Sequence, residues 1–135
     1  MVNGIVDYFE KKNIKIFGPN KKCSQLEGSK FFMKNICKKY NIPSAKYFEI
    51  SDINQIEKFL SSVSFPVVVK SDGLAAGKGV TICNNLDEVI KDVQEILDGK
   101  FKSSNKVFIE EFLEGEDLSY FVITDWYDYK CLGTA

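Results

Sequence analysis

Residues 70–80 of this 135-residue chain read KSDGLAAGKGV, a stretch that places two lysines, Lys70 and Lys78, among glycines and alanines. Its glycines are Gly73, Gly77 and Gly79. Glycine adopts positive φ readily, so the backbone N–H groups of such a loop can converge on one anion, and the lysines add charge there. The stretch therefore predicts either a phosphate-binding loop or an ordinary turn with solvated lysines, and by itself it does not decide between the two.

The stretch is not a Walker A loop. That motif has four residues between its glycines and Ser or Thr directly after its lysine, whereas three residues separate Gly73 from Gly77 and Gly79 follows Lys78. The long helix whose N-terminus supports the phosphates of a Walker A loop is also missing from the pattern. If this segment binds phosphate, we expect a hairpin to hold it.

A second candidate region is VFIEEFLEGEDLSY, residues 107–120, where adjacent carboxylates are followed by an apolar pair and more acids. An apolar hinge at Phe112 and Leu113 could offer backbone groups to the edge of an adenine, and an acid beyond it could accept ribose hydroxyls. The alternative for each single acid is the solvated end of a strand and its turn. Combined with the two lysines, the region predicts a nucleotide pocket.

The composition excludes several kinds of chemistry and partner. The chain has no histidine, so it contains no Ser/His/Asp triad and no HExxH zinc site. Its four cysteines form no CxxC pair, and we expect them to be reduced thiols. A net charge of -1 provides no overall field for nucleic acid or an anionic membrane. Without a signal sequence or about 20 consecutive apolar residues, we expect a cytoplasmic protein.

Hydrophobic periodicity predicts an α/β fold with about four mostly antiparallel strands, two helices on one face of the sheet and a loosely placed N-terminal segment. The continuous valine run before Lys70 predicts a strand covered on both faces. We expect the loop at 72–79 to be mobile without nucleotide. The predicted helices cover residues 4–13, 25–40, 51–60 and 86–97, and the predicted strands cover 14–17, 47–50, 66–70, 80–83, 106–112, 118–124 and 129–132.

Five stretches together carry a resemblance to a known family: IFGPN (16–20), QLEGSKFFMK (25–34), IPSA (42–45), FPVVVKSDGLAAGKGVTIC (65–83) and VFIEEFLEGED (107–117). The chain resembles the ATP-grasp superfamily and, within it, the phosphoribosylamine-glycine ligases, also called glycinamide ribonucleotide synthetases. The resemblance implies the tail of a Rossmann-like domain at 1–20, a connecting helix region at 21–45, and the ATP-grasp lid subdomain at 46–135. It also implies that the rest of the enzyme lies before Met1 and beyond Ala135.

The same resemblance implies roles for individual residues. Lys30 and Lys70 would contact ATP phosphates, with the loop from Asp72 to Gly79, including Gly73, Gly77 and Lys78, closing over them. Glu110 and the backbone of Glu111, Phe112 and Leu113 would line the adenine, and Asp117 would hold the ribose. The family commonly has Glu at this last position, so Asp117 is a shorter acid there. The resemblance assigns no catalytic residue here, and it implies that the Mg²⁺ ligands lie outside these residues.

The function that follows from the resemblance is ATP-dependent joining of glycine to 5-phosphoribosylamine in de novo purine biosynthesis. ADP, phosphate and a glycyl phosphate intermediate would form, and the partners would be small molecules rather than nucleic acid or membrane. We expect these 135 residues alone to be inactive. Two alternatives remain: a non-catalytic nucleotide-binding module, and an ATP-grasp ligase for another carboxylate. QLEGSK together with DGLAAGKG favours the purine enzyme over the latter.

Overall fold

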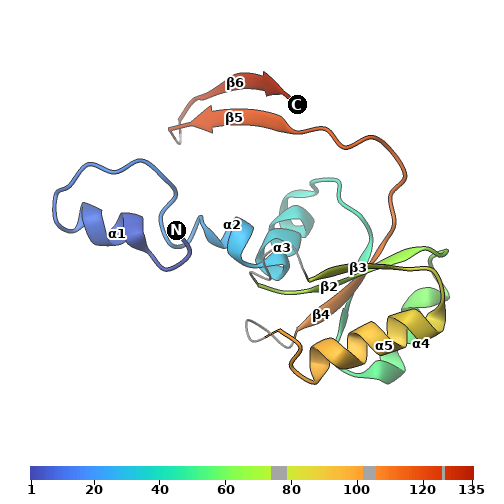
Figure 1. Cartoon of the computed structure of the whole chain (residues 1–135). Coiled ribbons are helices and arrows are strands. Elements are labelled where there is room, and N and C mark those ends of the chain that lie inside the picture. Colours follow the sequence, from blue (N-terminus) through green and yellow to red (C-terminus); the bar gives the residue numbers. More distant parts are fainter. Residues whose placement is uncertain (74–78, 102–105, 126) are drawn as a thin grey trace.

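The structure, a computed structural model, describes residues 1–73, 79–101, 106–125 and 127–135. It contains a four-stranded sheet with strand order β1-β4-β2-β3 and a separate β5-β6 hairpin (Figure 1). The strands are β1 (Tyr47–Ile50), β2 (Val67–Ser71), β3 (Val80–Cys83), β4 (Val107–Glu111), β5 (Tyr120–Thr124) and β6 (Tyr129–Thr134). The helices are α1 (Ile5–Glu10), α2 (Gln25–Gly28), α3 (Lys30–Tyr40), the 3₁₀ turn η1 (Ile53–Gln55), α4 (Ile56–Leu60) and α5 (Leu86–Leu97).

All three strand pairings in the four-stranded sheet are antiparallel. The register sets Val68 opposite Glu110 and Lys70 opposite Phe108. Because side chains alternate between faces, these four residues share one face, and Val67, Val69 and Ile109 share the other. The sheet thus has one mainly apolar face, on which Ser71 and Glu111 also lie, and one charged face that carries Lys70 and Glu110.

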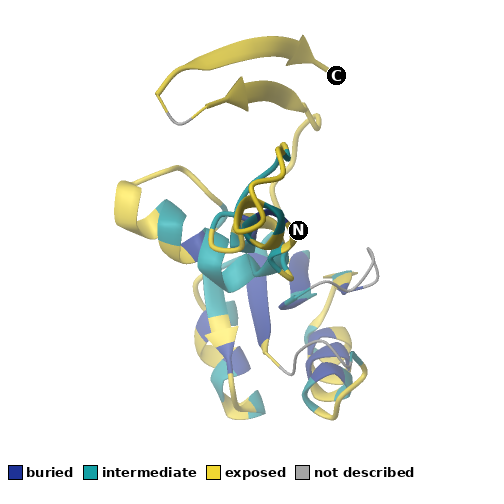
Figure 2. Ribbon diagram, turned by 90° about the vertical axis from the view of Figure 1, so that its left-hand side faces the viewer, coloured by how far each residue is buried: buried dark blue, intermediate teal, exposed yellow. Residues whose placement is uncertain are grey.

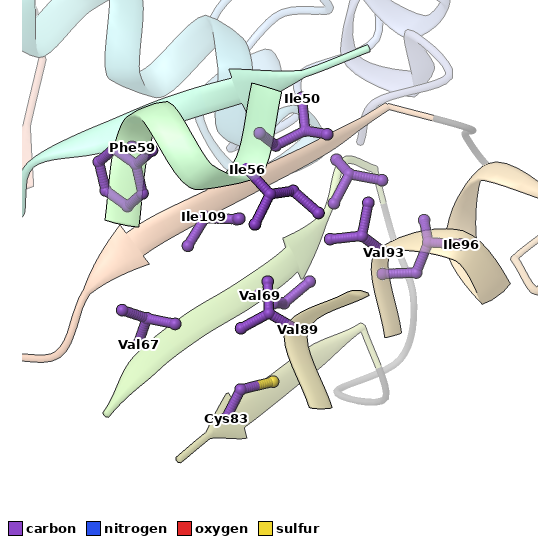
Figure 3. Close-up of a cluster of buried hydrophobic side chains, with 11 residues drawn as sticks. Ile50, Ile56, Phe59, Val67, Val69, Cys83, Val89, Val93, Ile96 and Ile109 are labelled. Atoms are coloured by element: carbon purple, nitrogen blue, oxygen red, sulfur yellow. The ribbon is translucent and has the colours of Figure 1, made fainter. Parts of the chain in front are cut away.

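The apolar face is covered by α4 and α5, as predicted (Figure 3). Figure 3 shows Ile56 and Phe59 on one side of this core and Val89, Val93 and Ile96 on the other, directed at the valines of β2. The apolar stripe of α5 follows helical spacing, and Asn85 caps the helix by accepting a hydrogen bond from the Glu88 backbone. Burial of these side chains is the main source of stability for the fold.

The opposite face of the sheet is covered by α3. The rings of Phe31 and Phe108 meet edge to face with centroids 5.6 Å apart. Val67, Val68 and Val69 are all buried, which confirms that the valine run is covered on both sides. Figure 2 shows this burial concentrated in the sheet and α5, while the β5-β6 hairpin is exposed along its length.

Several predicted elements differ from the structure. The helix expected over 4–13 is limited to α1, and the one expected over 51–60 begins as the 3₁₀ turn η1. The helix expected over 25–40 is interrupted at Ser29, whose extended backbone (φ -142°, ψ 115°) separates α2 from α3. Ser29 has a local reason to leave the helix, because its hydroxyl accepts the Phe32 N–H and so caps α3. The strand expected at 14–17 does not form: Ile14 and Phe17 are exposed, and no described strand pairs with this segment.

No helix among the described residues combines the length and the apolar character needed to cross a bilayer.

Candidate nucleotide-binding site

The charged face of the sheet brings together residues from β2 and β4. Lys70 Nζ lies 2.7 Å from Glu110 Oε2. The pair is possible because antiparallel register places the two side chains on the same face, diagonally across neighbouring strands. Two residues that are 40 positions apart in sequence therefore form one ion pair, and both had been predicted as site residues.

A third charged group in this cluster, Lys34, was missed by sequence reasoning. Its Nζ lies 2.9 Å from Glu110 Oε1 and also donates to Ser44 Oγ and to the Ala45 carbonyl. The ammonium further lies 5.2 Å from the centre of the Tyr47 ring. A usable signal was present, because Lys34 follows Lys30 by four residues and must share its face of α3.

Glu110 is consequently a buried carboxylate with one lysine on each oxygen, and only 4% of the residue is exposed. A buried charge is costly unless its oxygens are paired. Both oxygens already have partners in this arrangement. The prediction that Glu110 lines an adenine is not tested by it.

Lys30 occupies the first position of α3 and points at the start of the glycine-rich segment. Its Nζ donates to the Ser71 carbonyl at 2.9 Å and to the Gly73 carbonyl at 3.0 Å. Gly73 has φ 79°, the positive value for which glycine is suited. The position of this ammonium follows directly from the break at Ser29, which starts α3 at residue 30.

Asp72 anchors the same segment to α3. Its carboxylate accepts hydrogen bonds from Ser29 Oγ and from the backbone N–H of Phe31, and the residue is buried. An acidic group at the amino end of a helix is favoured by the helix dipole. Asp72 is therefore placed as a structural anchor of the loop rather than as a free acid.

The expected hairpin is confirmed at its two ends. β2 and β3 pair with Lys70 opposite Val80, and the Ser71 N–H donates to the Gly79 carbonyl at 2.9 Å. Residues 74–78, which include Gly77 and Lys78, lie outside the described residues. The predicted mobility of the loop falls mostly on these residues.

The predicted acidic hinge follows β4. Glu111 is bound to the start of β1, since its Oε1 accepts the Lys46 N–H and its own N–H donates to the Lys46 carbonyl. Phe112, Leu113 and Asp117 lie in the exposed connection between β4 and β5. The roles expected for these residues at the adenine and ribose stay predictions.

The lysines differ in their remaining capacity to bind an anion. An ammonium has three N–H donors. Within the described part of the chain, Lys30 uses two of them and Lys70 uses one, and the Lys70 side chain is 27% exposed. Lys34 uses all three and is buried. Chemically, the cluster can therefore offer free donors and positive charge through Lys30 and Lys70.

On the apolar face of the sheet, Cys83 is fully buried. Burial raises the pKa of its thiol to about 11, and the carboxylates of Asp92 and Glu88 add to the effect. Such a thiol stays protonated at neutral pH and is a poor nucleophile. All four cysteines are free, as expected from their spacing.

Comparison with known proteins gives a consistent result. Residues 28–135 match the family described as phosphoribosylglycinamide synthetase, ATP-grasp (A) domain. The chloroplastic phosphoribosylamine-glycine ligase of Arabidopsis thaliana is 46% identical over 127 residues, which are 93% of this chain and 24% of that protein. The Leptospira interrogans phosphoribosylamine-glycine ligase is 44% identical over 137 residues, covering 100% of this chain and 32% of that protein.

Among solved structures, the phosphoribosylamine-glycine ligase of Thermotoga maritima superposes with a TM-score of 0.81 at 33% identity, over 93% of this chain and 32% of that one. The chain thus spans about a quarter to a third of the length of these three relatives. The family match covers most of the sequence, and the structure has the expected antiparallel sheet, in which Lys70 pairs with Glu110. The chain belongs to the phosphoribosylglycinamide synthetase ATP-grasp family.

Proposed function

We propose that the chain forms the triphosphate-binding part of a phosphoribosylamine-glycine ligase of de novo purine biosynthesis. One observation carries the proposal: the ammonium groups of Lys30 and Lys70 lie at the root of the glycine-rich hairpin, and both keep donors that no described residue occupies. The reaction is inferred from the names of the relatives, and the role of this segment in it is inferred from the two lysines.

The residues present fit a nucleotide triphosphate. A triphosphate is strongly anionic and only accepts hydrogen bonds, and lysine ammonium groups and loop N–H groups only donate. In the proposed complex, Lys70 and Lys30 contact the phosphates, and Asp72 and Gly79, at the two ends of the glycine-rich loop, lie beside them. The backbone of 111–113 and the carboxylate of Asp117 are assigned to the adenine and ribose.

In the proposed reaction, the γ-phosphoryl group of ATP passes to the carboxylate of glycine, which gives glycyl phosphate and ADP. The amine of 5-phosphoribosylamine then attacks the carbonyl carbon, and phosphate leaves as the amide forms. The lysines orient the triphosphate and neutralise charge that develops on the transferring group. Magnesium, when bound, supplies further neutralisation of the phosphate oxygens.

We assign the magnesium ligands to parts of the enzyme outside this segment. Within the ranges that the structure describes, no group of three or more Asp, Glu or Cys residues could hold a metal ion. We likewise assign residues 1–20 to the end of a preceding domain, 21–45 to a connecting region and 46–135 to the lid subdomain. The last of these proposed boundaries lies one residue before β1, which starts at Tyr47.

The test is a segment exchange. This chain replaces the matching segment of the Leptospira interrogans enzyme, and ADP formation is measured with glycine and 5-phosphoribosylamine present together or singly. We expect turnover that requires both substrates. A folded chimera that binds ATP without turnover would favour a non-catalytic module, and turnover with a different carboxylate would change the substrate; either result contradicts the proposal.

The 135-residue chain by itself provides the complementary measurement. We expect weak ATP binding and no turnover from it, because the magnesium ligands are assigned elsewhere. Glycine-dependent ADP production by this chain alone would show that the metal assignment is wrong.

A further inference from the structure

Lys34, Glu110 and Lys70 form a continuous line of ion pairs that joins the buried side of α3 to the candidate phosphate site. One carboxylate is shared by two ammonium groups, with N–O distances of 2.9 Å and 2.7 Å. The side chain of Lys34 is 4% exposed and that of Lys70 is 27% exposed. The two lysines contact the same carboxylate from different environments.

Only one of these lysines is placed to meet a ligand. All three N–H donors of Lys34 are taken by Glu110, Ser44 and Ala45, so the group is bound on every side. Lys70 has one partner among the described residues and reaches solvent. Lys34 therefore has no donor left with which to contact a nucleotide.

The charge balance gives Lys34 a different task. Two ammonium groups and one carboxylate leave the cluster with a net charge of +1. Without Lys34, the remaining Lys70–Glu110 pair would be neutral. The carboxylate of Glu110 would then compensate the ammonium charge of Lys70 and weaken its attraction for an incoming anion. Lys34 thus shares the negative charge of Glu110, so that this carboxylate only partly compensates the positive charge of Lys70.

We propose that Lys34 is a positioning residue that neutralises Glu110 and thereby leaves the positive charge of Lys70 available to the phosphates of the nucleotide. The proposal rests on the proposed function, since it concerns the same nucleotide. It separates the two lysines by role: Lys70 contacts the ligand, and Lys34 acts only through Glu110.

A purely structural role is the competing explanation, because Lys34 also links α3 to the sheet. Three variants of the full 135-residue chain distinguish the two: Lys34→Met, the double variant Lys34→Met/Glu110→Gln, and Lys38→Met as a matched control. Lys38 lies one turn further along α3 and has no ion pair among the described residues, so its replacement removes the same charge from the same helix. Each is titrated with ATP and, separately, with adenosine by NMR, after thermal unfolding has shown that it is folded.

We expect Lys34→Met to weaken ATP binding by about tenfold, the scale of one unit charge at a partly buried site, and to leave adenosine binding within about twofold. The double variant again has a net charge of +1, because the glutamine introduced at position 110 is neutral and Lys70 remains. We expect it to regain at least about threefold in ATP affinity over Lys34→Met. Lys38→Met should match the unmutated chain with both ligands.

Three results would overturn the proposal while the unmutated chain still binds ATP. They are equal loss of ATP and adenosine binding in Lys34→Met, no recovery in the double variant, and the same ATP loss in Lys38→Met. Absence of any response of the unmutated chain to ATP would instead contradict the proposed function as well.

Discussion

The backbone N–H of Phe31 donates to the carboxylate of Asp72 across 3.3 Å, which joins the first turn of α3 to the start of the glycine-rich hairpin. Ser29 Oγ donates to the same carboxylate, and Lys30 donates to the carbonyls on either side of Asp72, those of Ser71 and Gly73. The amino end of α3 and the end of β2 are therefore held together by four side-chain and backbone contacts around Asp72.

Replacement of Asp72 by Ala should lower the free energy of unfolding by about 1–2 kcal/mol, because the first turn of α3 loses an acceptor and a favourable charge. Urea unfolding followed by circular dichroism measures this. Asp72→Asn keeps an acceptor and should lose less than half as much. Equal stability of Asp72→Ala and the unmutated chain would show that this contact does not anchor the loop.

Replacement of Lys70 by Ala should weaken ATP binding by about 1.5–3 kcal/mol, the range for a hydrogen bond to a charged group. Calorimetric titration of the chimera with ATP, in the absence of glycine, gives the value. Lys58→Ala is the control, since Lys58 is exposed on α4, the helix that covers the other face of the sheet. Unchanged affinity in the Lys70 variant would remove this residue from the site.

Ile109→Val should separate stability from binding, because Ile109 and Glu110 are neighbours on β4 that point to opposite faces. Ile109 is fully buried in the core, so the lost methylene should cost about 0.5–1.5 kcal/mol of stability. ATP affinity measured under native conditions should stay the same. A change in affinity comparable to that of Lys70→Ala would mean that the two faces are coupled.

The buried thiol of Cys83 should lower the free energy of unfolding of the chain at high pH. Its thiol pKa rises from an ordinary value of 9.0 to about 11 in the folded chain. The unfolded chain therefore releases this proton first as pH rises, and the contribution, fully present below pH 9, is lost between about pH 9 and 11. A shift of this size corresponds to about 2–3 kcal/mol.

The measurement for Cys83 compares urea unfolding of the unmutated chain and Cys83→Val at several pH values from about 8 to 11, the range over which the thiol titrates. The two proteins differ only at position 83, so the difference between their stabilities isolates the contribution of the thiol. The unmutated chain should lose stability relative to Cys83→Val as pH rises through this range. A difference that stays constant with pH would contradict burial as the cause of the raised pKa.

Much of the fold could be predicted from local pattern. The alternation and length of apolar runs placed β1, β2, β3 and α5 within one residue of their observed bounds. The spacing of the apolar residues in α5 also predicted which side of the helix is buried, because a helix of 12 residues presents one stripe to its sheet. A strand also needs a partner strand, which local pattern does not reveal. The pattern at 14–17 predicted a strand, and no described strand pairs with this segment.

The candidate site was predicted in part. Lys30, Lys70, Asp72, Gly73 and Glu110 were chosen as site residues, and the contacts among them gather these residues where α3 meets β2 and the charged face of the sheet. Lys34, on the amphipathic helix α3, was not predicted because lysines on such a helix are usually solvated. Only tertiary packing buries this one.

The contact that Asp72 makes was also beyond the sequence. The residue was expected to belong to a loop over the phosphates, and its bond to the backbone of Phe31 joins positions that are 41 apart in sequence. Local pattern carries no information on such a pairing, because the two groups meet only once the sheet and α3 have packed together.

The order of residue types along the chain determined the local elements, the glycine-rich hairpin and the family, since each depends on neighbours within a few positions or on a matching string. Tertiary structure alone decided the partners of each charge. Glu110 lies between two lysines from different elements because the antiparallel register and the packing of α3 place them there. Buried charges are stabilised by partners in space, and sequence separation does not encode which partners those are.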